Sequence, residues 1–144
     1  FLEYRGSYQD HTSINENWQQ LEAYALAQNL LSERSIFMTE IIDDEQIGDQ
    51  IRSRYNSAFI LDQPLSFEPT GLFRTRKHQR QKYVKFIHQG NLESSFAFYT
   101  QIYAFWIFDI DLEITDGPIL EFYPNYAEVT SDQELITEIY IPVH

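Results

Sequence analysis

The chain has 144 residues, with 10 lysines and arginines against 22 aspartates and glutamates, which gives a formal net charge of −12. This length suits one domain with a real hydrophobic core and is too short for two ordinary domains, so we expect a single domain over residues 1–144. The negative charge repels nucleic acid and favours cationic partners, while the lack of cysteine excludes disulfides and thiolate metal sites and suits the cytoplasm.

The first half of the chain follows the pattern strand–helix–strand–strand. The predicted elements are a strand over residues 1–6, a helix to about residue 32, and strands over residues 35–42 and 52–61. Ser13 or Asn15 can cap the helix, because their side-chain oxygens accept hydrogen bonds from its first backbone N–H groups. Between the last two strands, Asp43-Asp44-Glu45 and Gly48 predict an acidic loop.

The second half repeats this order after a turn predicted at Pro69-Thr-Gly71. Its elements are a strand over residues 82–88, a helix over residues 93–108, and strands over residues 119–123 and 135–143. In each half a strand ends at a glycine, Gly6 or Gly90, and an aromatic-rich helix follows. We interpret this as an α+β fold made of a duplicated module, with antiparallel sheets and two main helices. The two repeats span residues 1–64 and 80–144.

Side-chain alternation assigns two faces to each closing strand. In the first strand Leu120 and Phe122 share one face, and Ile119, Glu121 and Tyr123 share the other. The second strand has one almost wholly apolar face, which consists of Leu135, Thr137, Ile139, Ile141 and Val143. If the strands pair, we expect their second faces to form one surface carrying Glu121, Tyr123, Glu138 and Tyr140. An ordinary solvated sheet face is the alternative interpretation.

The second predicted helix is apolar on two sides. Its two stripes are Tyr99, Tyr103 and Trp106, and, beside them, Phe98, Ile102 and Phe105. One stripe must cover the sheet, and the other needs a partner: a ligand, the first helix through Trp18, or another subunit in a homodimer. Aromatic residues make up 16% of the chain, more than a core requires, which favours a ring-lined pocket or interface.

Several common functional sites are missing from the sequence. The four histidines show no metal-ligand spacing, and there is no nucleophile elbow, phosphate loop or paired-histidine helix, so we expect neither metal nor cofactor. The most apolar run, residues 96–108, is too short to cross a bilayer, and we expect no membrane association. Six of the ten basic residues lie between Arg74 and Lys85, where we expect a solvated hairpin rather than a nucleic-acid patch.

Taken in order, these motifs resemble a GyrI-like effector-binding domain, the ligand-sensing module of many AraC-type transcription regulators, which also occurs alone in gyrase-inhibitory proteins. The motifs that carry the resemblance are Tyr4-Arg5-Gly6, Trp18-x-x-Leu21, Asp43-Asp44, Arg54-Tyr55, Gln81-Lys-Tyr83, His88-Gln-Gly90, Tyr103 to Trp106, Gly117-Pro-Ile-Leu-Glu121-Phe-Tyr123 and Leu135 to Val143. The chain departs from the family pattern at Ile42 and Glu45, where an aromatic residue and a proline are usual, and after Trp106, where Leu-Pro is usual.

The resemblance implies two modules side by side about a pseudo-two-fold axis, with a ligand groove between them. It implies that Glu121 is the acid at the floor of this groove, which pairs with cationic ligands in multidrug-sensing relatives, and that Tyr8 lies at the groove edge. In a bacterial, cytoplasmic AraC-type regulator, DNA is bound by a separate helix-turn-helix domain, which we expect upstream of Phe1. The predicted ligand-binding residues are Glu121, Tyr123, Tyr140, Trp18, Tyr103, Trp106 and Tyr8.

The physics of Glu121 agrees with this role. A carboxylate among Ile119, Tyr123 and neighbouring rings would be desolvated, which raises its pKa unless a cation or hydrogen bonds compensate. A lipophilic cation would supply the missing charge, and each well-placed ring would add about 0.5–2 kcal/mol of cation–π attraction. The alternative is a purely structural glutamate bonded to a neighbouring tyrosine.

Three functions fit these observations. The first is sensing of a small, aromatic and cationic effector. The second is hydrolysis of a reactive small molecule, with Glu121 as general base on water and Tyr123 or Tyr140 assisting, which is the only case in which we assign catalytic residues. The third is a gyrase-inhibitor-like interaction module whose acidic residues, Asp43-Asp44-Glu45, mimic the charge of DNA.

Overall fold

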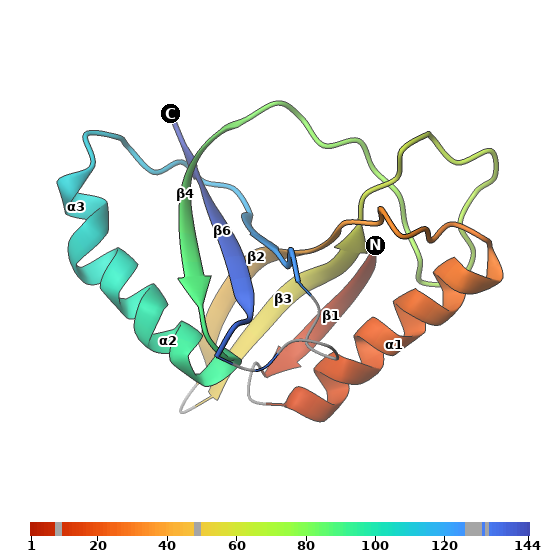
Figure 1. Cartoon of the computed structure of the whole chain (residues 1–144), viewed down its shortest axis with the longest axis horizontal. Coiled ribbons are helices and arrows are strands. Elements are labelled where there is room, and N and C mark those ends of the chain that lie inside the picture. Colours follow the sequence, from red (N-terminus) through yellow and green to blue (C-terminus); the bar gives the residue numbers. More distant parts are fainter. Residues whose placement is uncertain (8–9, 48–49, 126–130, 132) are drawn as a thin grey trace. The chain divides into compact units, whose positions relative to one another are not determined.

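The computed structural model describes residues 1–7, 10–47, 50–125, 131 and 133–144, and for residues 43–47, 50–53, 92–93 and 95–96 it describes the backbone alone. The chain divides into two compact units, Phe1–Gln79 and Arg80–His144 (Figure 1). Each unit contains three antiparallel strands and one main helix, so the expected α+β class with antiparallel sheet is confirmed.

The first unit contains β1 (Leu2–Ser7), α1 (His11–Ala27), β2 (Phe37–Ile47) and β3 (Gln50–Phe59). The central strand is β3, which pairs antiparallel with β1 on one side and β2 on the other. One face of this sheet carries Leu2 and Tyr55, which are buried together with Leu21 and Ala25 of α1. Asn17 of α1 is also buried there, and its amide donates to Leu2 O at 3.2 Å and to Ser57 Oγ at 2.9 Å. These bonds fix α1 against the sheet.

The ends of α1 differ from those predicted. The helix begins at His11 because Asp10 is its N-cap and accepts a hydrogen bond from the backbone N–H of Ser13 at 3.1 Å. It ends at Ala27 because Asn29 takes a left-handed conformation, with φ of 57°. The backbone N–H of Leu30 then bonds to the carbonyl of Ala25 at 2.9 Å, which terminates the helical ladder. The predicted caps, Ser13 and Asn15, and the predicted end near residue 32 are therefore wrong.

The acidic loop predicted at Asp43-Asp44-Glu45 is also wrong. These residues continue β2, where the backbone ladder with β3 extends to Ile47 beyond the apolar positions of the strand, across a register shift between Ile41 and Asp43. The apolar pattern alone predicted too short a strand, because backbone pairing does not need apolar side chains. Gly48 lies outside the described residues.

Residues 60–79, here called the connecting segment, are docked on the first unit. Phe73 forms an isolated β-bridge with Leu2 and stacks on the ring of Tyr24, with centroids 3.9 Å apart. The backbone N–H of Thr70 donates to the hydroxyl of Tyr24 at 3.2 Å. The turn predicted here is confirmed, since the N–H of Phe73 bonds to the carbonyl of Thr70 and Gly71 has a positive φ of 64°.

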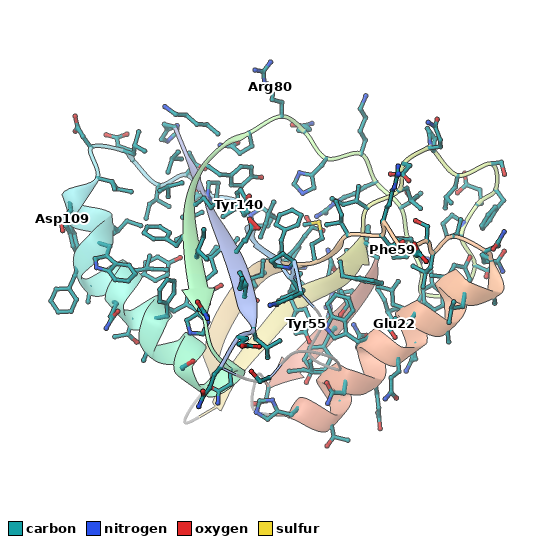
Figure 2. The ribbon with its side chains drawn as sticks, in the orientation of Figure 1. Glu22, Tyr55, Phe59, Arg80, Asp109 and Tyr140 are labelled. Carbon is teal, nitrogen blue, oxygen red and sulfur yellow. The ribbon has the colours of Figure 1, made fainter. Side chains whose placement is uncertain are left out.

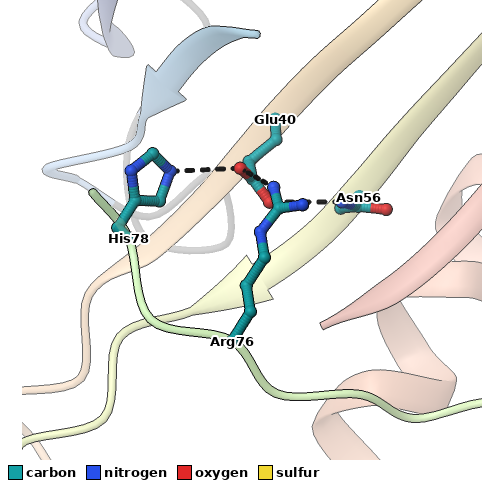
Figure 3. Close-up of polar contacts among 4 residues, drawn as sticks. All are labelled: Glu40, Asn56, Arg76 and His78. Carbon is teal, nitrogen blue, oxygen red and sulfur yellow. Dashed lines mark hydrogen bonds and ion pairs between the residues drawn. The ribbon is translucent and has the colours of Figure 1, made fainter. Parts of the chain in front are cut away.

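Glu40 of β2 holds the next part of the connecting segment (Figure 3). Its carboxylate is buried and accepts hydrogen bonds from the Arg76 guanidinium, from Nε2 of His78 at 3.1 Å and from the Asn56 amide at 3.2 Å. Burial alone raises the pKa of Glu40, but the hydrogen bonds of Arg76 and Asn56 and the charge of Arg76 outweigh it, so the pKa lies below its ordinary value. Arg76 also lies over the ring of Phe1, 5.2 Å from its centroid.

The basic run does not form the predicted hairpin. Residues 74–81 have no regular secondary structure, and the first strand of the second unit begins at Lys82. Arg76 pairs with a buried carboxylate, and Arg74 donates to the carbonyls of Gly71 and Phe73. These arginines hold the connecting segment in place.

The second unit contains β4 (Lys82–Gln89), α2 (Leu92–Gln101), a π-helical turn η1 (Ile102–Trp106), α3 (Ile107–Asp109), β5 (Ile119–Phe122) and β6 (Ile136–Val143). The central strand is β6, which pairs antiparallel with β4 and β5. The fully buried core cluster of the second unit contains Ile102, Ile139 and Ile141. The Asn91 side chain caps α2 by accepting from the N–H of Ser94 at 2.9 Å.

The helix predicted over residues 93–108 is continuous from Leu92 to Asp109 but contains the π-helical turn η1. The N–H of Ile107 bonds to the carbonyl of Ile102, five residues earlier, which inserts one extra residue into the turn. This insertion changes which residues face the sheet. Ile102 and Ile107 pack in the core, whereas Phe105, which a regular helix would keep on the side of Ile102, is 66% exposed.

The units share the element order strand–helix–strand–strand, and in each the last strand is the central one. Among the described residues, no helix is long and apolar enough to cross a membrane.

Glu40→Gln provides a test of the buried ion pair. Because the substitution keeps the side-chain shape but leaves Arg76 without its counter-charge, we expect it to lower the free energy of unfolding by about 1–3 kcal/mol, measured by urea denaturation at pH 7. The folded-state pKa of Glu40 lies below its unfolded value. The difference in the free energy of unfolding between wild type and variant should therefore be largest above the unfolded pKa. It should disappear as the pH falls through the folded pKa.

Glu3→Gln is the matched control, because Glu3 lies in the same cross-strand row as Asn56 and Glu40 but forms an exposed pair with Arg5. We expect it to change the free energy of unfolding by less than about 0.5 kcal/mol. Equal losses in the two variants would show that Glu40 has no special role. Faster backbone hydrogen exchange in residues 70–79 of the Glu40 variant alone would support the docking role.

Candidate functional site

The position of Glu121 is set by the pairing of β5 with β6. The register places Leu120 opposite Tyr140 and Glu121 opposite Ile139. Residues opposite each other in an antiparallel pair lie on the same face, so Glu121 shares the face of Ile139, on which α2 and η1 pack. The predicted common surface of Glu121 with Glu138 and Tyr140 is therefore wrong. The alternation was correct and Leu120 is buried, but Leu120 lies opposite Tyr140, so the expected core faces of β5 and β6 are on opposite sides of the sheet.

The carboxylate of Glu121 accepts hydrogen bonds from two tyrosines. The hydroxyl of Tyr99, on α2, donates to Oε2 at 2.7 Å, and that of Tyr123, just after β5, donates to Oε1 at 3.1 Å. Burial of the side chain raises the pKa of Glu121 above its ordinary value, while the two hydrogen bonds act in the opposite direction and compensate only in part. Among the residues that the structure describes, no cationic side chain pairs with this carboxylate.

The surroundings of Glu121 are aromatic and apolar. Ile119, two residues before it on the same face of β5, and Tyr99 both pack on the core of the second unit. Trp106 lies over β4 on the same face of the sheet, with its ring 6.1 Å from Phe86 and 5.1 Å from Phe98, and it is 37% exposed. Such surroundings make an unpaired negative charge costly.

Tyr140 belongs to a different cluster on the opposite face of the sheet. Its hydroxyl donates to Glu138 at 3.2 Å, and its ring contacts Phe122, with centroids 5.2 Å apart. The ammonium of Lys85 lies 2.5 Å from Glu138 and 5.6 Å from the centroid of the Tyr140 ring. The hydrogen bond from Lys85 lowers the pKa of Glu138, so this second carboxylate already has its cation. Tyr140 can assist Glu138, not Glu121.

The structure gives no contact between Glu121 and the remaining predicted site residues that it describes. Trp18 lies on α1 of the first unit, where its ring contacts Phe37 at a centroid distance of 6.2 Å. Tyr103 lies on η1 and is 42% exposed. Tyr8 lies outside the described residues. A cavity of about 300 Å³ in the first unit, between residues 29–32 and 61–67, contains none of the predicted site residues.

His88 and Ser94 form a pair that resembles a base and a nucleophile, with Nε2 and Oγ 3.0 Å apart. The Ser94 hydroxyl donates to the carbonyl of Asn91 at 2.9 Å, so His88 must donate its Nε2 proton to Ser94. Burial lowers the pKa of His88, which favours this neutral form. The pair thus completes the cap of α2 and leaves no base beside the hydroxyl. Within the described part of the chain, no three acidic or histidine side chains are grouped to hold a metal ion.

Sequence analysis missed Tyr99 as a site residue, although it recognised the helical stripe to which Tyr99 belongs. The contact joins residues 22 positions apart on α2 and β5, and their relative placement depends on the sheet register. The available signal was the position of Tyr99 in the first half of a helix that must cover the sheet, which puts its hydroxyl within reach of a strand. The site that the structure brings together is Glu121 with Tyr99 and Tyr123, on the face covered by Trp106.

Comparison with known proteins identifies the family of the chain. The family model described as the GyrI-like small molecule binding domain matches residues 1–144, the whole chain. A search of curated proteins found no significant match. A match over the full length establishes membership, and the chain belongs to the family of GyrI-like small-molecule-binding domains.

Proposed function

We propose that the chain is the effector-binding domain of an AraC-type transcription regulator and that it binds a small, aromatic, cationic molecule at Glu121. The observation that carries this proposal is the state of the Glu121 carboxylate. It is held by two neutral phenol groups among apolar side chains, and its pKa is raised by burial. Because the chain belongs to a small-molecule-binding family, we attribute the energetic cost of this buried carboxylate to ligand binding.

A cationic ligand would remove the cost of the buried charge. Its positive group would pair with Glu121, and its apolar part would contact rings of the kind that Trp106 and Phe86 provide on this face. The hydroxyls of Tyr99 and Tyr123 already orient the carboxylate, so less side-chain entropy is lost on binding. A neutral ligand of the same shape would gain the apolar contacts without the ion pair, and this difference gives the site its selectivity.

The regulatory context rests on the family resemblance and on charge. A chain with a net charge of −12 is repelled by DNA, so a regulator of this kind needs a separate DNA-binding domain. A bacterial protein without cysteine suits the reducing cytoplasm. The effector would act by binding one arrangement of the protein better than another.

The duplication and the groove also belong to this proposal. The shared element order and the shared position of the central strand support two copies of one module. A pseudo-two-fold axis and a ligand groove between the repeats stay predictions from the family resemblance, as do the ligand contacts of Trp18, Tyr8, Tyr103 and Tyr140.

Hydrolysis is the second candidate, and the raised pKa of Glu121 favours it. A general base works best when its pKa lies near the operating pH, and burial moves the pKa of Glu121 in that direction. The hydroxyl that assists would come from Tyr99 or Tyr123, because Tyr140 lies on the other face. A gyrase-inhibitor-like role for Asp43-Asp44-Glu45 stays a prediction, since their side chains lie outside the description.

Ligand binding can be tested by a fluorescence titration with a panel of aromatic cations and their neutral analogues. In a Trp18→Phe background, Trp106 is the only tryptophan and reports on the unit that contains Glu121. We expect saturable quenching by cations and a loss of affinity of about tenfold or more on Glu121→Gln, because an ion pair in apolar surroundings is removed. Release of product from a bound compound, detected by mass spectrometry, would favour the hydrolase.

Glu138→Gln is the control for that titration, because Glu138 is a second half-buried glutamate that already pairs with Lys85 on the opposite face. It should leave cation affinity unchanged. Equal loss in both variants, or cation binding that survives Glu121→Gln, would contradict the assignment of the site.

The raised pKa of Glu121 also predicts a pH effect on stability. Between the unfolded and folded pKa values the folded state binds more protons, so the contribution of Glu121 to stability falls as the pH rises through this window. Glu121→Gln removes the titration, so urea denaturation from pH 4 to pH 8 should show the variant gaining on wild type as the pH rises. A difference that is constant with pH would show that burial does not perturb this carboxylate.

A further inference from the structure

The helical end of the second unit exposes an unusual number of large apolar side chains. Phe108 is 79% exposed, Phe105 66% and Tyr103 42%, and Leu112 and Ile114 beyond α3 are exposed as well. Single exposed apolar residues are normal on a protein surface, but a cluster within twelve consecutive residues is typical of an interaction surface. We call Phe105, Phe108, Leu112 and Ile114 the apolar patch.

The π-helical turn helps to create this patch. A regular helix would keep Phe105 on the side of Ile102, which is fully buried, but with the extra residue in η1 it is Ile107 that packs on the core, while Trp106 contacts the ring of Phe98 and is 37% exposed. The core of the second unit is thus complete without Phe105. π-Helical turns are rare and frequently occur at functional sites.

Acidic residues border the apolar patch. Asp109, Asp111, Glu113 and Asp116 are all exposed, and Figure 2 shows Asp109 at the end of α3, at the outer edge of the ribbon. No lysine or arginine follows Lys85 in the whole sequence. The segment that carries the patch therefore combines apolar side chains with flanking acids and has no lysine or arginine of its own, which favours cationic partners by charge complementarity.

We propose that the apolar patch docks a cationic amphipathic helix of a partner protein or domain. Its apolar face would cover Phe105 and Phe108, in the manner of a helix bound along a hydrophobic surface, and its lysines or arginines would meet Asp109, Asp111 and Glu113. A second copy of this chain is a poor occupant, because a symmetric contact would bring the same acidic borders together. An anionic membrane surface is excluded by the same repulsion.

The test uses a fluorophore-labelled leucine–lysine peptide patterned as an amphipathic helix, and fluorescence anisotropy measures its binding to the whole chain. A peptide with glutamate in place of lysine is the counter-probe and should not bind. We expect Phe105→Ser with Phe108→Ser to weaken binding by about tenfold or more, as loss of aromatic anchors does. Asp109→Asn with Asp111→Asn should weaken it at low salt and much less at high salt.

Matched controls separate the patch from general attraction to an acidic protein. Leu26→Ser with Leu72→Ser removes two equally exposed apolar residues of the first unit, and Asp62→Asn with Glu68→Gln removes two of its exposed acids. Both control variants should keep the affinity of wild type. Because the patch residues are exposed, melting temperature and circular dichroism should be unchanged in every variant.

Three outcomes would overturn the proposal: absence of saturable binding, equal weakening in patch and control variants, or self-association of the chain that the Phe105 and Phe108 substitutions abolish. The last would make the patch a contact between copies. The proposal is independent of the ligand site, and Glu121→Gln should leave peptide binding unchanged.

Discussion

The pairing register between β5 and β6 is the constraint on which the chemistry of the second unit depends. It places Glu121 opposite Ile139, on the face covered by α2, and Leu120 opposite Tyr140. A slip by one residue would exchange the two faces of β5 and move the carboxylate to the side on which Lys85 and Glu138 already pair. Glu121 would then be one more member of a charged surface cluster. In the actual register, phenol groups are its only side-chain partners among the described residues.

Comparison of three carboxylates explains why Glu121 is distinctive. Glu40 is buried but receives the charge of Arg76, and Glu138 receives that of Lys85, and in both the pKa is lowered. Glu121 has two tyrosine hydroxyls but, within the part of the chain that the structure describes, no such charge, and its pKa is raised. Glu40 and Glu138 are therefore each stabilised by a cationic side chain together with hydrogen bonds. In the function proposed above, an effector would supply the cation that Glu40 and Glu138 receive from side chains.

Periodicity in the sequence predicted the elements well, because the strands and helices bury regular apolar stripes. It did not determine which face of β5 joins the apolar face of β6, since Leu120 and Phe122 are as apolar as Ile119 and Tyr123. The partners of Glu40 come from a segment 36 and 38 residues away, and local pattern carries no information on such contacts. The π-helical turn was equally hidden, because Phe105 and Trp106 are both suitable core residues. In the structure Trp106 contacts Phe86 and Phe98, whereas Phe105 is exposed.

The continuous helical stretch from α2 to α3 connects the two proposed surfaces of the second unit. Tyr99 in its first half holds Glu121, and Phe105 and Phe108 in its second half belong to the apolar patch. A ligand that paired with Glu121 beside Tyr99 would change the forces on the same stretch that presents the patch. For this to transmit a signal, the stretch must have two arrangements that both contacts favour unequally. The π-helical turn η1 lies between Tyr99 and Phe108 and contains Phe105, and π-helical turns frequently occur at functional sites.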